Sequence, residues 1–126
     1  MSQDVVADAL NQIMNCKGAG KEYLEVNKYS KLLMNVLEIA KDNGYIEKYG
    51  LDEKEKKIKI KLGKINKCLA IKPRFNVTVD EIEKYMRRFL PSRNFGIILI
   101  STSKGLITQR EAYEKNIGGN LIAYFY

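Results

Sequence analysis

The chain has 126 residues, of which 45% are hydrophobic and 29% are charged, which is the ordinary composition of a soluble globular protein. This length allows one or two small units with their own cores and excludes a large multidomain enzyme. The net charge of +7 comes from the second part of the chain. Residues 1–50 hold six lysines and seven acidic residues, whereas residues 51–126 hold sixteen basic and eight acidic residues. A basic domain favours polyanionic partners, either nucleic acid or an anionic membrane surface.

The first 62 residues predict an N-terminal α-β-α-β-β lobe, in which two helices cover one face of a small sheet. Apolar residues at helical spacing predict a first helix, and Ser30 is positioned to cap a second helix that ends at Asn43 and Gly44. A charged turn is expected at residues 50–56. The predicted helices and strands of this lobe lie at residues 3–16, 23–26, 30–42, 45–49 and 57–62.

Lysines alternate strictly with apolar residues over residues 57–62, which predicts a strand with its isoleucines in the core and its lysines outside. This lysine row has two interpretations. It could be a stripe that follows phosphates, or it could guard an open face or edge of the sheet against aggregation. We favour the guard, since no aromatic residue is interleaved with the lysines to stack on bases.

The second lobe is predicted as mostly antiparallel β-structure with short helices, so the fold class is α/β (α+β) with two small lobes. Two capping boxes begin helices, one at Thr78 and Glu81 and one at Thr108 and Glu111, and Pro91 ends the first of these helices. The predicted domains are residues 1–66 and 67–126. Strands of the second lobe are expected at residues 68–71, 97–100 and 121–126.

A polar loop from Ser101 to Gly105 follows the buried strand at residues 97–100 and carries most of the chemistry of the sequence. Its three hydroxyls, one ammonium and one glycine suit a sugar-phosphate surface. Gly118 and Gly119 permit a turn with positive φ.

The sequence offers little for catalysis or metal binding. It has no histidine, and its two isolated cysteines, Cys16 and Cys68, are expected to be buried reduced thiols in an intracellular protein. Ser101 and Lys104 stand at the S-x-x-K spacing of penicillin-recognising enzymes, but no helix is predicted to align them. No apolar run approaches the roughly 20 residues of a membrane span. We therefore expect a cytosolic protein with no catalytic residue, metal, cofactor, small-molecule substrate or membrane partner.

Several motifs in order resemble the small-subunit ribosomal protein eight family. The C-terminal motifs are Gly96-Ile97, Ile100-Ser101-Thr102-Ser103-Lys104-Gly105, Thr108-x-Arg110-Glu111-Ala112 and Gly118-Gly119. An N-terminal motif, Asn43-Gly44-Tyr45-Ile46, supports them, and two further motifs, Lys64-Ile65-Asn66-Lys67-Cys68 and Lys72-Pro73-Arg74-Phe75, resemble the archaeal and eukaryotic branch. The resemblance spans nearly the whole chain. Phe75 departs from it, since many relatives have tyrosine there, and Gln109 stands where relatives often have histidine.

The resemblance implies a two-lobe protein of the cytoplasmic ribosome that binds the central domain of small-subunit ribosomal RNA early in assembly, beside neighbouring small-subunit ribosomal proteins. It implies a grip on an irregular RNA helix, mainly through the second lobe. The implied RNA contacts are Ser101, Thr102, Ser103, Lys104, Gly105, Gly118, Gly119, Asn120, Arg74, Phe75, Asn15, Ser30 and Lys31. Two alternatives remain open: a general RNA-binding or translational-control module that acts on messenger RNA, and an enzyme based on the Ser101/Lys104 spacing.

Overall fold

The computed structural model describes residues 4–92 and 95–126. The chain divides into two compact units, Met1–Cys68 and Leu69–Tyr126, each with its own core. Within these described residues, four helices and antiparallel sheets confirm the mixed α/β (α+β) class predicted from the sequence. None of the helices in the described residues combines the length and the apolar character that a membrane span requires.

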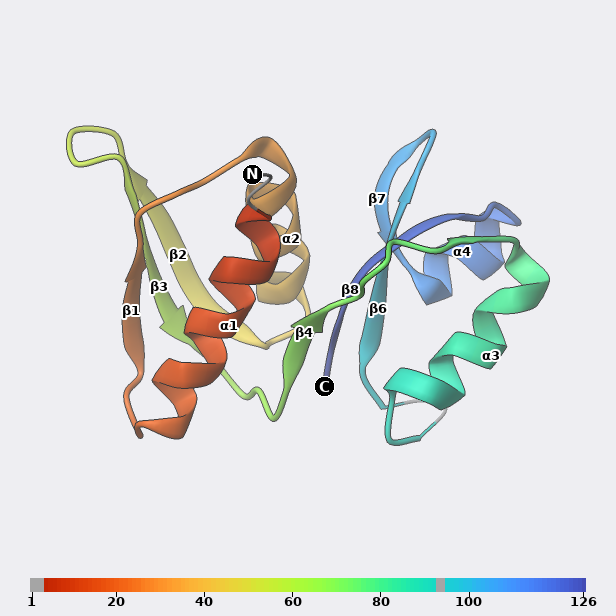
Figure 1. Ribbon diagram of the computed structural model, residues 1–126, viewed down its shortest axis with the longest axis horizontal. Helices are drawn as coiled ribbons and strands as arrows, with labels where there is room; N and C mark the ends of the chain where they lie inside the picture. Colours follow the sequence, from red (N-terminus) through yellow and green to blue (C-terminus); the bar gives the residue numbers. More distant parts are fainter. Residues whose placement is uncertain (1–3, 93–94) are drawn as a thin grey trace. The chain divides into compact units, whose positions relative to one another are not determined.

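The N-terminal unit packs two helices side by side on one face of a three-stranded antiparallel sheet (Figure 1). Ser30 caps the second helix as predicted, since its hydroxyl oxygen accepts a hydrogen bond from the Leu33 amide at 3.2 Å. The elements follow the predicted order: α1 (Val5–Gly18), β1 (Tyr23–Val26), α2 (Lys31–Asp42), β2 (Ile46–Asp52) and β3 (Lys57–Leu62).

Strand β3 lies in the middle of this sheet, in the order β1-β3-β2. Its alternation works as predicted: Ile58, Ile60 and Leu62 are buried in the core, and the lysines between them lie on the opposite face. Strand β2 extends to Asp52, three residues into the predicted turn, because residues 50–52 continue the pairing with β3. The strand order therefore leaves β3 with hydrogen-bonded neighbours on both sides.

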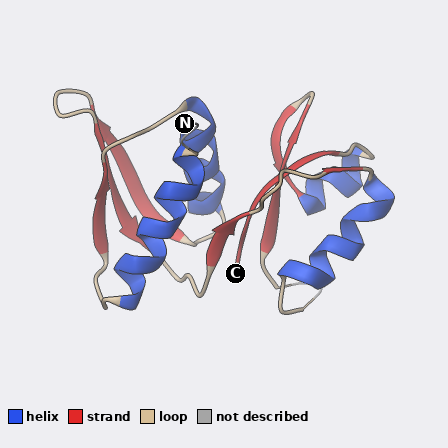
Figure 2. Cartoon of the chain, viewed as in Figure 1, coloured by secondary structure: helices blue, strands red, loops and turns tan. Residues whose placement is uncertain are grey.

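The second unit packs its helices on one face of a mainly antiparallel sheet (Figure 2). The sheet order is β4-β8-β6-β7, and β5 also pairs with β8. The core of this unit includes Ile98 and Ile100 from the sheet and Ile82 from a helix. The elements are β4 (Cys68–Ala70), β5 (Asn76–Val77), α3 (Val79–Phe89), β6 (Ile97–Thr102), β7 (Gly105–Thr108), α4 (Gln109–Lys115) and β8 (Gly119–Phe125).

Two strands of the second unit, β5 and β7, were not predicted from the sequence. Both are short, and β5 pairs with the distant β8, whereas β7 pairs with β6 across a tight turn that the run of hydroxyl residues concealed. The two cysteines are buried and free, as predicted. Burial raises the pKa of the Cys68 thiol to about 12, so this thiol remains protonated and packs as a small apolar side chain.

Candidate nucleic-acid interface

The predicted polar loop is the tip of a β-hairpin, and the prediction of a loop at Ser101 and Thr102 was wrong. Ser101 pairs with Leu106 and Thr102 pairs with Gly105, so only Ser103 and Lys104 form the turn. A run of hydroxyl residues has the composition of a loop, but Ser and Thr are tolerated in a strand that finds a partner. The hairpin projects beyond the neighbouring strands of its unit (Figure 1).

The hydroxyl of Thr102 holds the turn together from inside. It donates a hydrogen bond to the Gly105 carbonyl at 2.8 Å and accepts one from the Lys104 amide at 3.1 Å. Gly105 has φ +109°, a left-handed conformation that favours glycine, although a Cβ there would meet open space. Gly105 therefore allows the backbone conformation of the turn, and the Thr102 hydroxyl has a mainly structural role.

Ser103 and Lys104 are exposed at the tip, and their side chains form no hydrogen bond or ion pair with any described residue. Ser101 is half-buried at the base of the tip. A hydroxyl can both donate and accept, whereas an ammonium only donates. The tip thus presents one free hydroxyl and one free cation on a short hairpin that Thr102 keeps rigid.

A row of polar side chains crosses three strands next to the hairpin. Asn76 on β5 pairs with Asn120 on β8, and Asn120 pairs with Ser101 on β6. Directly opposed residues of antiparallel strands point to the same face of the sheet, so these two amides and one hydroxyl lie side by side. Asn76 was missed by the sequence reasoning, because only the pairing of β5 with β8 brings it to Asn120.

Gly118 and Gly119 do not have positive φ, so that part of the prediction was wrong. A Cβ on Gly119 would collide with the carbonyl oxygen of Ser101, and one on Gly118 with that of Val77. These glycines are required because β8 passes very close to the backbones of β5 and β6. The close approach that they allow is within the protein, and it fixes the position of Asn120 relative to Ser101.

Gln109 is a buried structural residue. Its side-chain carbonyl accepts a hydrogen bond from the Ile98 amide at 2.8 Å, and its side-chain amide donates to the Gly96 carbonyl at 3.2 Å. Strand β7 ends at Thr108, so the Gln109 amide continues the pairing with β6 in place of a backbone. Gln109 stands where relatives often have histidine, and this difference therefore affects the strands that support the hairpin and not its exposed tip.

The other predicted contact residues lie outside the hairpin and β8 and belong to both units. Phe75 packs on α3, with its ring stacked on Tyr85 at 5.4 Å between centroids, whereas Arg74 is exposed. Asn15 is exposed near the end of α1, while Ser30 and Lys31 lie at the start of α2, at the opposite end of the helix pair (Figure 1). Within the second unit, the structure brings together the predicted residues of the hairpin and β8, and Phe75 lies next to them, since its carbonyl accepts a hydrogen bond from the Leu121 amide at 2.9 Å.

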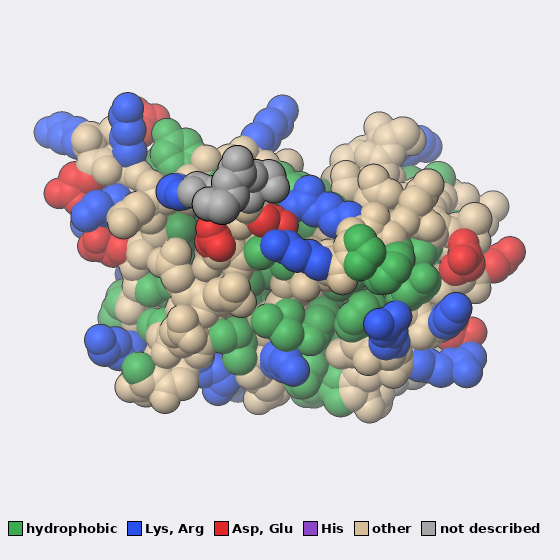
Figure 3. Space-filling view, viewed as in Figure 1, with side chains coloured by type: hydrophobic (Ala, Val, Ile, Leu, Met, Phe, Trp, Pro, Cys, Tyr) green, Lys and Arg blue, Asp and Glu red, His purple; other side chains and the backbone are tan. Residues whose placement is uncertain are grey.

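Charge alone does not locate this interface. In the space-filling view, Lys and Arg side chains project at separate points on the visible face of each unit, with Asp and Glu among them (Figure 3). Within residues 4–92 and 95–126, no group of three His, Cys, Asp or Glu side chains could hold a metal ion. The side chains of the hairpin tip and of the row beside it carry hydroxyl, amide and ammonium groups.

Comparisons with known proteins agree on one family. The family described as "Ribosomal protein S8" matches residues 4–126. The small ribosomal subunit protein uS8 of Nanoarchaeum equitans is 46% identical, over 100% of both chains. That of Methanococcoides burtonii is 44% identical over 98% of this chain and 97% of its own length, and that of Archaeoglobus fulgidus is 42% identical over 100% of both.

Proposed function

Because this chain belongs to the ribosomal protein S8 family, we propose that it is a structural protein of the small ribosomal subunit that binds the subunit's RNA directly. The family resemblance predicted from the sequence is thereby confirmed. The family consists of structural ribosomal proteins and not of enzymes, so the S-x-x-K spacing of Ser101 and Lys104 has no catalytic meaning. The place of action that we propose is the ribosome in the cytoplasm.

The RNA partner that we propose is an irregular helix in the central domain of the small-subunit RNA. Double-stranded RNA displays its 2′-hydroxyls and readable base edges in a wide, shallow minor groove. The free hydroxyl of Ser103 suits a ribose or base edge in that groove, and Lys104 suits an adjacent phosphate. The amides of Asn76 and Asn120 extend this polar surface across the sheet.

The observation that carries the proposal is the hairpin tip, where a rigid turn presents Ser103 and Lys104 without any internal partner in the described residues. A preordered donor loses little conformational freedom on binding, so its hydrogen bonds contribute fully to affinity. We also propose that the protein binds this RNA early in assembly of the subunit and that it contacts neighbouring small-subunit proteins.

Replacement of Ser103 by alanine tests this proposal. We expect Ser103→Ala to raise the Kd for a central-domain ribosomal RNA fragment about 3- to 10-fold, since one lost hydrogen bond costs about 1 kcal/mol. Filter binding or fluorescence anisotropy would measure this Kd. Ser92→Ala removes an exposed hydroxyl outside the hairpin and is the matched control, and Lys59→Ala should cost less than Ser103→Ala. Equal losses for Ser103→Ala and Ser92→Ala would overturn the hairpin-centred proposal.

A general RNA-binding or translational-control module makes a different prediction. Such a protein would bind an unrelated RNA duplex as tightly as the central-domain fragment, with a steep dependence on salt. A competition titration between the two RNAs separates these functions. We expect the unrelated duplex to compete poorly.

A further inference from the structure

The sheet of the N-terminal unit has a second face that no element within residues 4–68 covers, since α1 and α2 both lie on the opposite face (Figure 2). We call it the outer sheet face. It consists of Tyr23 and Glu25 on β1, Lys57, Lys59 and Lys61 on β3, and Lys48, Gly50 and Asp52 on β2.

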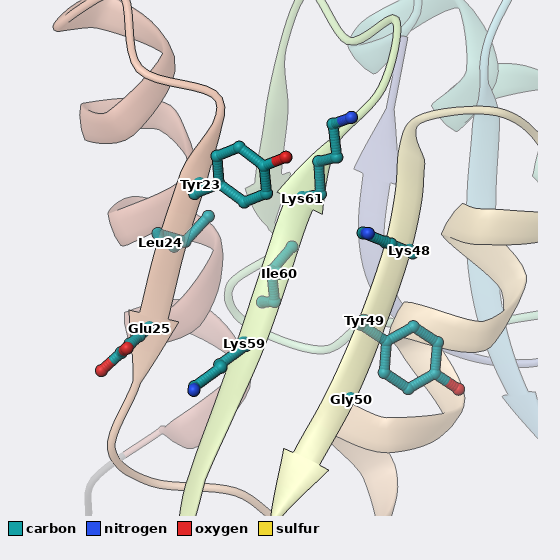
Figure 4. A pocket seen from close by; sticks show the side chains of 9 residues that line it. All are labelled: Tyr23, Leu24, Glu25, Lys48, Tyr49, Gly50, Lys59, Ile60 and Lys61. Atoms are coloured by element: carbon teal, nitrogen blue, oxygen red, sulfur yellow. The ribbon is translucent and has the colours of Figure 1, made fainter.

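An exposed aromatic ring stands next to the lysines of this face. Tyr23 pairs with Lys61, and Lys61 pairs with Lys48 on the other side, so the three side chains form one row across the sheet. The Tyr23 ring leans from β1 towards Lys61 (Figure 4), whose Nζ lies 5.5 Å from the ring centroid. Yet 60% of Tyr23 is exposed, a large fraction for an aromatic side chain.

The next row contains a depression. Lys59 lies between Glu25 and Gly50, and a Cβ on Gly50 would have no atom within 4 Å apart from those of its own chain neighbours. A hollow of about 710 Å³ lies here, and its lining includes Tyr23, Tyr49, three lysines and one glutamate, together with Leu24, Gly50 and Ile60. Its charged side chains are therefore mainly basic, and the rest of its lining is aromatic or apolar.

Two of the lysines on this face, Lys48 and Lys59, form no ion pair with a described residue. Lys57 pairs with Glu25 at 3.6 Å and Lys61 with Glu47 at 3.1 Å, and such exposed pairs contribute little to stability. Lys48 and Lys59 have no carboxylate within 4.0 Å among the described residues. They are free to attract an anionic ligand.

The structure weighs against an aggregation guard. A guard at the edge of a sheet protects the free backbone of an edge strand, whereas β3 is paired on both sides. The lysines also lacked an aromatic neighbour in the sequence, whereas the pairing of β1 with β3 places Tyr23 beside Lys61. Solvation of an uncovered face explains lysines, but it does not explain an exposed tyrosine beside a hollow.

We propose that the outer sheet face is a second RNA-binding surface, which takes an unpaired RNA strand. One base would stack on Tyr23, and phosphates would lie on Lys48 and Lys59. An unpaired strand fits better than a duplex, because only unstacked bases offer their faces to an aromatic side chain. The proposal rests on the proposed function only in assuming that the protein acts on RNA.

The test uses the full-length protein and a fluorescein-labelled oligouridine of about ten nucleotides, followed by fluorescence anisotropy. We expect saturable binding that Tyr23→Ala weakens about fivefold or more, as the loss of one stacked base would do. Lys59→Met should weaken binding and reduce the slope of log K against log salt by about 0.7, the value for one phosphate on a single strand. Lys59→Arg keeps the positive charge, so its affinity for oligouridine and its salt slope should match those of wild type.

Matched controls remove the same groups elsewhere on the N-terminal unit. Tyr29→Ala removes another exposed tyrosine, and Lys41→Met removes an exposed lysine of α2, so neither should change oligouridine binding. Ser103→Ala should also leave it unchanged while weakening the central-domain fragment, so the two proposals fail separately. The inference is overturned if wild-type protein does not bind oligouridine, or if Tyr23→Ala binds it within twofold of wild type. It is also overturned if a polyglutamate peptide binds as tightly, which would mark an acidic protein segment as the occupant.

Discussion

Gln109 shows how a single side chain can replace part of a strand. Only 7% of the residue is exposed, and its amide group satisfies the Ile98 amide and the Gly96 carbonyl at the point where β7 ends. A buried backbone group without a partner is costly, so the first half of β6 depends on this residue for its pairing on that side. The hairpin at the far end of β6 is held in place by the same strand.

We expect Gln109→Ala to destabilise the second unit by about 1–3 kcal/mol, because the buried Ile98 amide would lose its acceptor. Gln109→Met keeps the volume of the side chain and removes both hydrogen bonds, so it should cost a similar amount. Urea denaturation followed by circular dichroism, together with hydrogen exchange of the Ile98 amide, would measure the loss. Arg110→Ala changes an exposed neighbour and should stay within about 0.5 kcal/mol of wild type. A Met variant as stable as wild type would show that the hydrogen bonds are dispensable.

At the scale of elements, local rules predicted the helices well and the strand partners poorly. Caps and apolar periodicity act over a few residues, so Ser30 and the spacing of Ile82 and Met86 were enough to place α2 and α3. The hairpin at Ser103 was missed because its pairing is not visible in a hydroxyl-rich composition. Gly119 was misjudged because a sequence does not distinguish a glycine needed for φ from one needed for space.

Helix α3 offers a pH test of its capping box. The Glu81 carboxylate accepts a hydrogen bond from the Thr78 amide at 3.0 Å, and this bond lowers the pKa of Glu81 below its ordinary value. A lowered pKa in the folded state stabilises the protein above the ordinary carboxyl pKa, and the stabilisation is lost as the pH falls through the folded pKa.

Glu81→Ala should therefore lower the Tm at neutral pH, and the difference in Tm from wild type should close as the pH falls from neutral through the lowered pKa of Glu81. Glu81→Gln keeps an acceptor without the charge, so its gap to wild type should depend on pH in the same way but be smaller at neutral pH. Thermal unfolding followed by circular dichroism across this pH range measures both. A gap between wild type and Glu81→Ala that does not change with pH would contradict a role for the ionised carboxylate.

At the scale of the whole molecule, the chain carries two separately cored units and two basic surfaces of different design. The hairpin of the second unit presents a hydroxyl and an ammonium on a rigid tip, whereas the outer sheet face presents a ring, a hollow and lysines. Tyr23 and Lys61 are far apart in sequence, and the order β1-β3-β2 alone makes them neighbours. Residue composition predicted an affinity for polyanions and the motifs pointed to residues 101–105, but the strand pairing was needed to add Asn76 to that surface and to find the outer sheet face.

Deletion of residues 121–126 tests the separation of the two units. Strand β8 pairs with β4, β5 and β6, and Leu121 to Phe125 are all buried, so its removal takes away the middle of the second sheet. Each lost large side chain costs about 2–5 kcal/mol, and together they exceed the roughly 5–15 kcal/mol that stabilises a domain.

In two-dimensional NMR spectra, we expect the amide signals of β6 and β7 to collapse while those of α1 and α2 stay dispersed. The truncated chain should no longer bind the central-domain RNA fragment but should still bind oligouridine. The control variant Tyr126→Ala should bind both RNAs. Collapse of the α1 and α2 signals as well would show that the N-terminal unit depends on the second for its fold.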